Sequence, residues 1–234
     1  ENQYEGYTKA VKNLFLHLEK GNLGVSKEDI YVLGDIIKVD KRFETCMEIA
    51  LSSAISNIIT NDENTAKTLI SYLKSKSLGR ATFLPLSIIK GKKALISREV
   101  SQLPGYIGIA SDLINYEEKY TNAILYVLGR TLICHDMNSA LLVAKKTNFS
   151  HKIVTLDGEV VNVGGALTGG SSFHKNTSII SRKREIEEIL QGLKVSEEKI
   201  RKLTEEQHRI EEEYKNTEEL MQSSKDNIHF KQID

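Results

Sequence analysis

The sequence predicts an α+β fold, in which a duplicated α/β domain of two similar halves is flanked by an antiparallel coiled coil. Three observations lead to this prediction: a heptad pattern at the carboxyl end, an internal repeat in the middle, and a short amphipathic segment at the amino end. We expect an incoming coil helix at 1–22, a first half at 23–102, a second half at 103–181 and an outgoing coil helix at 182–234.

The amino-terminal segment has apolar residues at helical spacing. They alternate steps of four and three, at Tyr7, Val11, Leu14 and Leu18. Gly21-Asn22 then forms a typical helix stop. The helix could pack on the globular region or pair with the outgoing helix. Because helical segments bracket the globular region on both sides, the coil interpretation is favoured.

An internal repeat divides the globular region into its halves. Residues 35–51 match residues 112–128 at an offset of 77. A β-branched run follows each copy and ends at an aspartate, Asp62 or Asp136, at an offset of 74. Each copy then continues with a helix-like stretch and a further strand. The repeat therefore predicts two similar α/β units, joined near Pro104.

The carboxyl end carries a long heptad repeat. From residue 182 onward there are 14 acidic and 11 basic residues and no proline. The seam of the repeat takes every seventh position and is mostly apolar. Its members are Ile186, Leu193, Ile200, Gln207, Tyr214, Met221 and Ile228. This spacing is typical of a coiled coil, and polar residues within the seam indicate a specific but weak one. A helix over 186–228 would be roughly 65 Å long, so it needs a partner helix.

Composition excludes several classes of protein. The 234 residues include 32 basic and 32 acidic side chains, so net charge predicts no partner. Cys46 and Cys134 have no C-x-x-C spacing, which argues against a disulfide framework or a zinc module and favours a reducing compartment. The chain has neither a membrane-spanning apolar run nor a signal peptide, so we expect a cytoplasmic location. Its first residue is Glu, and we expect a fragment of a longer protein.

The segment VVNVGGALTGGSS at 160–172 nearly matches a phosphate-binding P-loop. Gly170 stands where the lysine of G-x-x-x-x-G-K-[ST] belongs, and no apolar periodicity follows before about Ile186. A P-loop needs both the lysine and a helix that begins at once, so nucleotide binding is disfavoured. Glycine also lets another backbone approach closely, and an exposed strand edge tends to associate. Dimerisation is therefore the preferred role for Gly164, Gly165, Gly169 and Gly170.

No other motif predicts catalysis. Gly105 and Gly108 are too close for a dinucleotide fingerprint. Cys134-His135-Asp136 has no second Cys or His nearby, and adjacent strand residues point to opposite faces. His151 and His174 are isolated. We therefore expect no catalytic residue, no cofactor and no metal site.

Two clusters of basic residues are candidate DNA contacts. Lys90, Lys92, Lys93 and Arg98 lie between the halves, and Lys175 precedes Arg182, Lys183 and Arg184 at the start of the coil. Such clusters bind phosphates through counterion release. A solvated surface explains each cluster equally well, so both interpretations stay open.

Five sequence stretches resemble one family. They are YEGYTKAVK (4–12), GRATFLPL (79–86), GIASDLI (108–114), YVLGRTLI (126–133) and TLDGEVVNVGGALTGG (155–170). The chain resembles the hinge domain of the structural maintenance of chromosomes (SMC) family, bacterial condensin type, over nearly its whole length.

The resemblance implies a chromosome-organising function without enzymatic activity. In that family the hinge homodimerises two coiled-coil arms, and the first half of one hinge meets the second half of the other. By this resemblance Gly164, Gly165, Gly169 and Gly170 are dimer-interface residues. The expected partners are a second copy and non-specific DNA near the coil junction, with ATP bound only by head domains outside this fragment. The expected location is cytoplasmic and nucleoid-associated.

One departure from the family pattern lies in the first half. Ser52-Ser53 stands where the family often has a glycine, so any glycine-dependent contact there is in question. The rival hypotheses are a DNA-binding module with incidental dimerisation and, more remotely, a degenerate nucleotide-binding enzyme.

Overall fold

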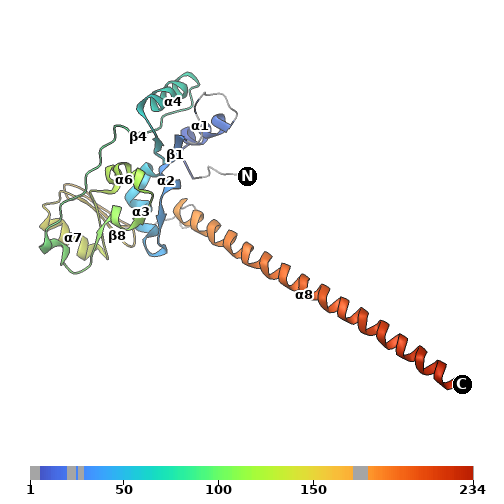
Figure 1. Cartoon of the computed structure of the whole chain (residues 1–234). Coiled ribbons are helices and arrows are strands. Elements are labelled where there is room, and N and C mark those ends of the chain that lie inside the picture. The colour runs from blue at the N-terminus through green and yellow to red at the C-terminus, as the bar shows by residue number, and fades with distance from the viewer. Residues whose placement is uncertain (1–5, 20–24, 26–28, 171–178, 234) are drawn as a thin grey trace. The chain divides into compact units, whose positions relative to one another are not determined.

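The computed structural model describes residues 6–19, 25, 29–170 and 179–233. The first half contains α1 (Lys9–Glu19), β1 (Ile30–Val32), α2 (Leu33–Ile36), β2 (Lys38–Val39), α3 (Glu44–Leu51), β3 (Ile58–Thr60), α4 (Glu63–Ser75) and β4 (Phe83–Pro85), with 3-10 helices at Lys41–Phe43 and Ser52–Ser56. These elements lie in the blue to teal part of Figure 1.

The second half follows the same plan and extends it. It contains α5 (Arg98–Ser101), β5 (Tyr106–Ile109), β6 (Ile114–Asn115), α6 (Thr121–Leu128), β7 (Thr131–Cys134), α7 (Met137–Lys146), β8 (Lys152–Thr155), β9 (Val160–Val161) and β10 (Leu167–Thr168), with 3-10 helices at Ala110–Asp112 and Glu118–Tyr120. The sequence ends in α8 (Ile179–Ile233).

The sheets confirm the predicted duplication. In the first half β3 pairs antiparallel with β1 and parallel with β4. In the second half β7 pairs antiparallel with β5 and parallel with β8. Antiparallel β9 and β10 then widen the second sheet, giving the order β10-β9-β8-β7-β5. The two halves thus share a three-stranded pattern, to which, among the described residues, only the second half adds a hairpin.

A local two-fold axis relates the halves. β2 and β6 form a small antiparallel sheet in which Lys38 pairs with Asn115. Asn115 lies 77 positions after Lys38, so each is the counterpart of the other in the repeat. An antiparallel pair of counterparts lies on a two-fold axis. The duplicated sequence therefore forms an internal pseudodimer.

One apolar core joins the two halves. Leu33 and Met47 of the first half and Ile124, Leu128 and Ile133 of the second belong to the same buried cluster, each with 0% of its surface exposed. Burying a large aliphatic side chain contributes about 1.5–3 kcal/mol, so this shared cluster is a main source of stability. The halves are consequently parts of one compact unit, which extends to Lys183.

The assignment of the amino-terminal helix to the coiled coil needs correction. Val11, Leu14 and Leu18 of α1 are buried in a cluster that includes Ile58 of β3 and Leu69 of α4. His17 Nδ1 of α1 also lies 2.7 Å from the hydroxyl of Tyr72 in α4. The helix therefore packs on the first half, which was the alternative interpretation. Four positions at helical spacing could not distinguish these two burial partners.

The long outgoing helix is present as α8, the orange to red helix of Figure 1. Its 55 residues give a length of about 80 Å. Ile180, in its first turn, is only 6% exposed and belongs to the shared core. From Arg184 onward the helix is a separate unit, whose apolar seam residues are at least half exposed, from 50% at Ile186 to 69% at Tyr214. Such exposure is expected of a coiled-coil helix, because its apolar seam packs against another helix.

Candidate functional site

The glycine-rich segment forms a β-hairpin, called here the glycine hairpin (residues 160–168). β9 and β10 pair antiparallel, Leu167 with Val161. The Asn162 amide donates to the Ala166 carbonyl at 2.8 Å, and the Gly165 amide donates to the Asn162 carbonyl at 2.9 Å. Gly164 and Gly165 have φ angles of +84° and +97°. The turn itself therefore requires these two glycines, since other residues rarely adopt such φ values.

This hairpin does not have the architecture of a P-loop. A P-loop joins a strand to a helix that starts immediately after it. Here Gly164 and Gly165 lie in a turn between two antiparallel strands. Ser171, the last position of the near-match, lies outside the described residues. The P-loop interpretation thus lacks both the lysine and the strand-to-helix connection.

The outer surface of the hairpin is apolar and exposed. Val163 is 64% exposed and Leu167 is 55% exposed. β10 is the last strand of its sheet, so its outer edge has no strand partner among the described residues. A Cβ added at Gly169 would lie 3.7 Å from the Glu159 side chain, which is ordinary contact. Nothing within the described part of the chain therefore requires a glycine at position 169.

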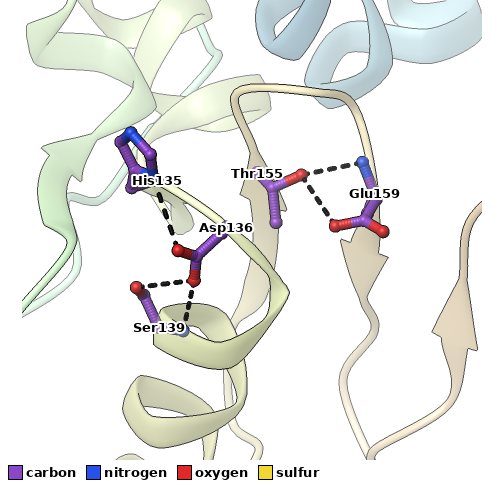
Figure 2. A network of polar contacts seen from close by, with 5 residues as sticks. All are labelled: His135, Asp136, Ser139, Thr155 and Glu159. Carbon is purple, nitrogen blue, oxygen red and sulfur yellow. Dashed lines mark hydrogen bonds and ion pairs between the residues drawn. The ribbon is translucent and has the colours of Figure 1, made fainter.

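The polar residues at the end of β7 form a helix cap (Figure 2). Asp136 accepts hydrogen bonds from the amide and the hydroxyl of Ser139, both at 2.8 Å. The Ser139 amide is the main cause of the lowered pKa of Asp136. His135 lies 3.4 Å from the Asp136 carboxylate, and no bond joins it to Ser139 in the picture. The three residues therefore do not form a Ser-His-Asp relay.

The same cap occurs at the equivalent position of the first half. Asp62 accepts from the Thr65 amide at 2.8 Å and begins α4. An aspartate at this position supplies an acceptor for amides that the helix leaves unpaired. The aligned aspartates of the repeat are thus structural. Cys134, beside the second cap, is buried, and burial raises its pKa to about 12, so it is no nucleophile at neutral pH.

No metal site occurs among the described residues. No group of three His, Cys, Asp or Glu side chains lies close enough to hold an ion in that part of the chain. Likewise, none of the described helices combines the length and the apolar composition that crossing a membrane would need. His174 and Lys175 lie outside the described residues.

The candidate DNA-binding lysines differ in their environments. Lys90 and Lys92 are exposed, whereas Lys93 pairs with Asp112 at 2.7 Å. They belong to an extended segment, called here the strap (residues 89–97), which runs from β4 to the second half (Figure 1). Arg98 begins α5 directly after the strap and is exposed.

Most basic residues at the start of α8 already interact with other groups of the chain. The Lys183 ammonium donates to the Asp35 carbonyl, and Arg184 pairs with Glu188 at 2.7 Å. Arg182 has an interaction partner as well. Since these residues already have partners within the chain, they are weaker candidates for DNA contact than Lys90 and Lys92.

Two contacts between the halves were missed from the sequence. The Lys152 ammonium donates to the carbonyls of Ile49 and Ala50 at the end of α3, both at 3.0 Å. Gly91 of the strap lies against α6, where an added Cβ would come within 2.4 Å of the Asn122 oxygen and the Tyr126 nitrogen. The sequence offered only two signals for these contacts: a lysine at the start of an apolar strand and a glycine among lysines. Neither signal indicates which residues the lysine or the glycine contacts.

Comparison with known proteins identifies the class. The family model for the flexible hinge domain of SMC proteins matches residues 26–144. The chain therefore belongs to the SMC hinge family, in which the hinge mediates dimerisation. The matched domain is a hinge rather than a catalytic ATPase domain.

Individual relatives show which SMC proteins the chain is similar to. The chain is 42% identical to the chromosome partition protein Smc of Clostridium kluyveri over 99% of its length, and 36% identical to that of Bacillus subtilis over 85%. It covers 20% and 16% of these relatives, so it spans at most about a fifth of their length.

Solved structures agree with these relatives. An asymmetric dimer of the Geobacillus stearothermophilus SMC hinge domain matches with a TM-score of 0.74 and 34% identity, over 86% of this chain and 80% of that chain. The Pyrococcus furiosus SMC hinge domain matches with a TM-score of 0.55 and 31% identity, over 73% and 88%. The predicted fold class and family are confirmed.

Proposed function

We propose that this chain is the homodimerisation hinge of an SMC chromosome-organising protein and joins two coiled-coil arms. The observation that carries the proposal is the glycine hairpin, which presents exposed apolar side chains and, beside Gly169, a strand edge that no other described strand covers. The asymmetric dimer of the Geobacillus hinge supports self-association. The four domain boundaries given above belong to this proposal, except that α1 is assigned to the first half and α5, whose Val100 packs in the core of the second half, to the second.

The placement of the sheet edges suggests how two copies would meet. β4 is one of the two edge strands of the first-half sheet, and β10 is one of the two edge strands of the second. A two-fold dimer in which the first half of one copy meets the second half of the other makes the same contact twice and closes a ring. The interface would include Gly169 and Gly170.

The clean test of this interface uses Gly169. Replacing all four glycines would mix two effects, because Gly164 and Gly165 are needed for the turn. Gly169→Ala adds a methyl group that the chain itself accommodates, so it should leave the monomer folded and shift the dimer to monomer. Sedimentation velocity at micromolar concentration measures the shift. Gly192→Ala, at an open position of α8, is the matched control.

Two results would count against this proposal in different ways. A wild-type chain that sediments as a monomer would contradict dimerisation. A Gly169→Ala variant with unchanged dimer affinity would leave dimerisation in place and move the interface away from this glycine.

We also propose non-specific DNA contact, carried by the exposed ammonium groups of Lys90 and Lys92. Lys93 is excluded from the test because its change to Glu would face Asp112. Lys90→Glu/Lys92→Glu should weaken binding and lower the salt slope by roughly 2 if each lysine contacts one phosphate. Lys67→Glu/Lys74→Glu, on the exposed face of α4, is the charge-matched control. If both pairs of substitutions weakened DNA binding equally, the binding would depend on the overall charge of the chain and not on Lys90 and Lys92.

The remaining parts of the function concern the whole protein. We propose a cytoplasmic, nucleoid-associated location and an ATP requirement met by head domains, and the similarity to chromosome partition proteins supports this proposal. The rival hypothesis, a DNA-binding module with incidental dimerisation, expects DNA affinity to survive in a monomeric Gly169→Ala variant and to be its main activity. Chromosome segregation in cells that carry this variant distinguishes the two hypotheses.

A further inference from the structure

The loop after α7 has an unusual backbone. Asn148 and Phe149 both adopt φ angles of +51°. Positive φ is uncommon for any residue other than glycine, and it is a clear outlier for a bulky one, whereas asparagine is comparatively tolerant. Strain of this kind persists only where surrounding contacts hold it, and it often marks a functional position.

The end of α4 shows what an ordinary helix end in this fold needs. There Ser77 adopts a φ of +52°, and the next residue, Leu78, does not have a positive φ. The Leu78 amide donates to the Leu73 carbonyl at 3.0 Å, as the Phe149 amide donates to the Ala144 carbonyl at 2.8 Å. One left-handed residue therefore completes this type of cap. Capping accounts for Asn148 and leaves the φ of Phe149 unexplained.

Phe149 instead contacts the turn of the glycine hairpin. Its carbonyl accepts a hydrogen bond from the Gly164 amide at 3.0 Å. Its ring lies against Gly165, where an added Cβ would be 3.5 Å from the ring. The same ring packs on the apolar cluster beneath the second sheet. Phe149 thus joins the hairpin turn to the buried core of the second half.

We propose that Phe149 is a positioning residue for the dimer interface, and that its strained backbone holds the glycine hairpin in the orientation that a second copy binds. This inference rests on the proposed dimerisation function. β9 is anchored by its pairing with β8. The turn and β10 are less supported, because Val163 and Leu167 are exposed and β10 pairs with β9 alone among the described strands. Without Phe149 the turn would sample other orientations, and each association event would have to order it again.

The experiment compares three variants of the purified chain. Phe149→Ala removes the ring, and Phe149→Gly also removes the backbone strain. Asn148→Gly is the control, because it changes the adjacent left-handed residue that only caps α7. We expect both Phe149 variants to raise the dissociation constant of the dimer at least tenfold and to speed hydrogen exchange of the Gly164 amide. Asn148→Gly should leave both quantities within twofold of the wild type.

Hydrogen exchange across the sheet separates positioning from general stability. Amides of Ile133 and Val154, on the central strands β7 and β8, should keep their protection in the Phe149 variants. Equal loss of protection there would contradict the inference and indicate a merely structural residue, as would an unchanged dimer affinity. A monomeric wild-type chain would instead contradict the proposed function on which the inference rests.

Discussion

The two halves of the globular unit follow one plan, and they differ mainly in the segments just after α3 and α6. After α3 the chain makes a 3-10 helix before β3, whereas after α6 it enters β7 almost at once. This difference accounts for the change of the repeat offset from 77 to 74. The strands and caps are equivalent, so divergence is concentrated at the helix ends and in the hairpin that only the second half has.

The first difference concerns backbone geometry. Ser52 follows α3 with a φ of +48°, while its counterpart Gly129 follows α6 with an ordinary φ of −63°. The first half, where φ is positive, has a serine, and the second half, where φ is ordinary, has the glycine. Gly129 is needed for space instead, because an added Cβ would lie 2.4 Å from the Leu125 carbonyl oxygen.

The second difference concerns what covers the two helix ends. The last carbonyls of α3 accept hydrogen bonds from the Lys152 ammonium. The end of α6 is covered by the strap, where the Ala94 amide donates to the Gly129 carbonyl at 2.7 Å. Two equivalent ends are therefore covered by a side chain in one case and by backbone in the other. Duplicated sequences diverge most where each copy meets a different neighbour.

The largest expected effect comes from the strap. Gly91→Ala should lower the free energy of unfolding by roughly 3 kcal/mol, because the new methyl group would meet backbone atoms of α6 that cannot move cheaply. Urea unfolding followed by circular dichroism measures it. Gly108→Ala is the control, since its Cβ would lie 3.6 Å from Leu113. Equal stability of the two variants would mean that the strap is not held against α6.

The next effect tests the contact that covers α3. Lys152→Met keeps most of the apolar stem and removes the ammonium, so the Ile49 and Ala50 carbonyls lose their donor. The expected loss is about 2 kcal/mol. Burial lowers the pKa of Lys152, which opposes its charged form, so a variant as stable as the wild type would show that desolvation outweighs both bonds.

A smaller effect of opposite sign is expected at Ser52. Ser52→Gly should raise the free energy of unfolding by about 1 kcal/mol, because glycine adopts a positive φ without steric cost. The adjacent Ser53→Gly, where φ is not positive, should not stabilise the chain. A destabilised Ser52→Gly variant would indicate that the serine side chain contributes more than its backbone costs.

The smallest expected effect tests the feature that the halves share. Hydrogen bonds, chiefly from the Thr65 and Ser139 amides, lower the pKa of Asp62 and Asp136. Their folded pKa values lie below the unfolded value of about 3.9, so their stabilisation is present above that value and is lost as the pH falls through the folded pKa. Asn is also a good cap but does not titrate. Asp62→Asn and Asp136→Asn should therefore each make the loss of stability below about pH 5 less steep, by similar amounts. Urea midpoints between pH 6 and 2.5 provide the measurement, and unequal effects would break the equivalence of the halves.

Much of the fold could be predicted from local patterns. The repeat placed the strands that end at Asp62 and Asp136 and the helical stretches that follow, α4 and α7, because these features depend on residues a few positions apart. The capping role of the two aspartates was not predicted. The glycine segment was only half explained. Its position at a strand was expected, but the need for Gly164 and Gly165 inside a turn was not, since this depends on β10 pairing with β9.

The sequence by itself determined the duplication, the equivalent positions of Asp62 and Asp136 and the heptad seam of α8, because spacing along the chain carries all three. Only the tertiary structure decided that α1 packs on the first half, that Lys152 reaches α3 about 100 residues away, and that Phe149 supports the glycine turn. An amphipathic face shows that a residue will be buried but not against what. That choice is made by the three-dimensional packing of segments distant in the chain, which periodicity does not encode.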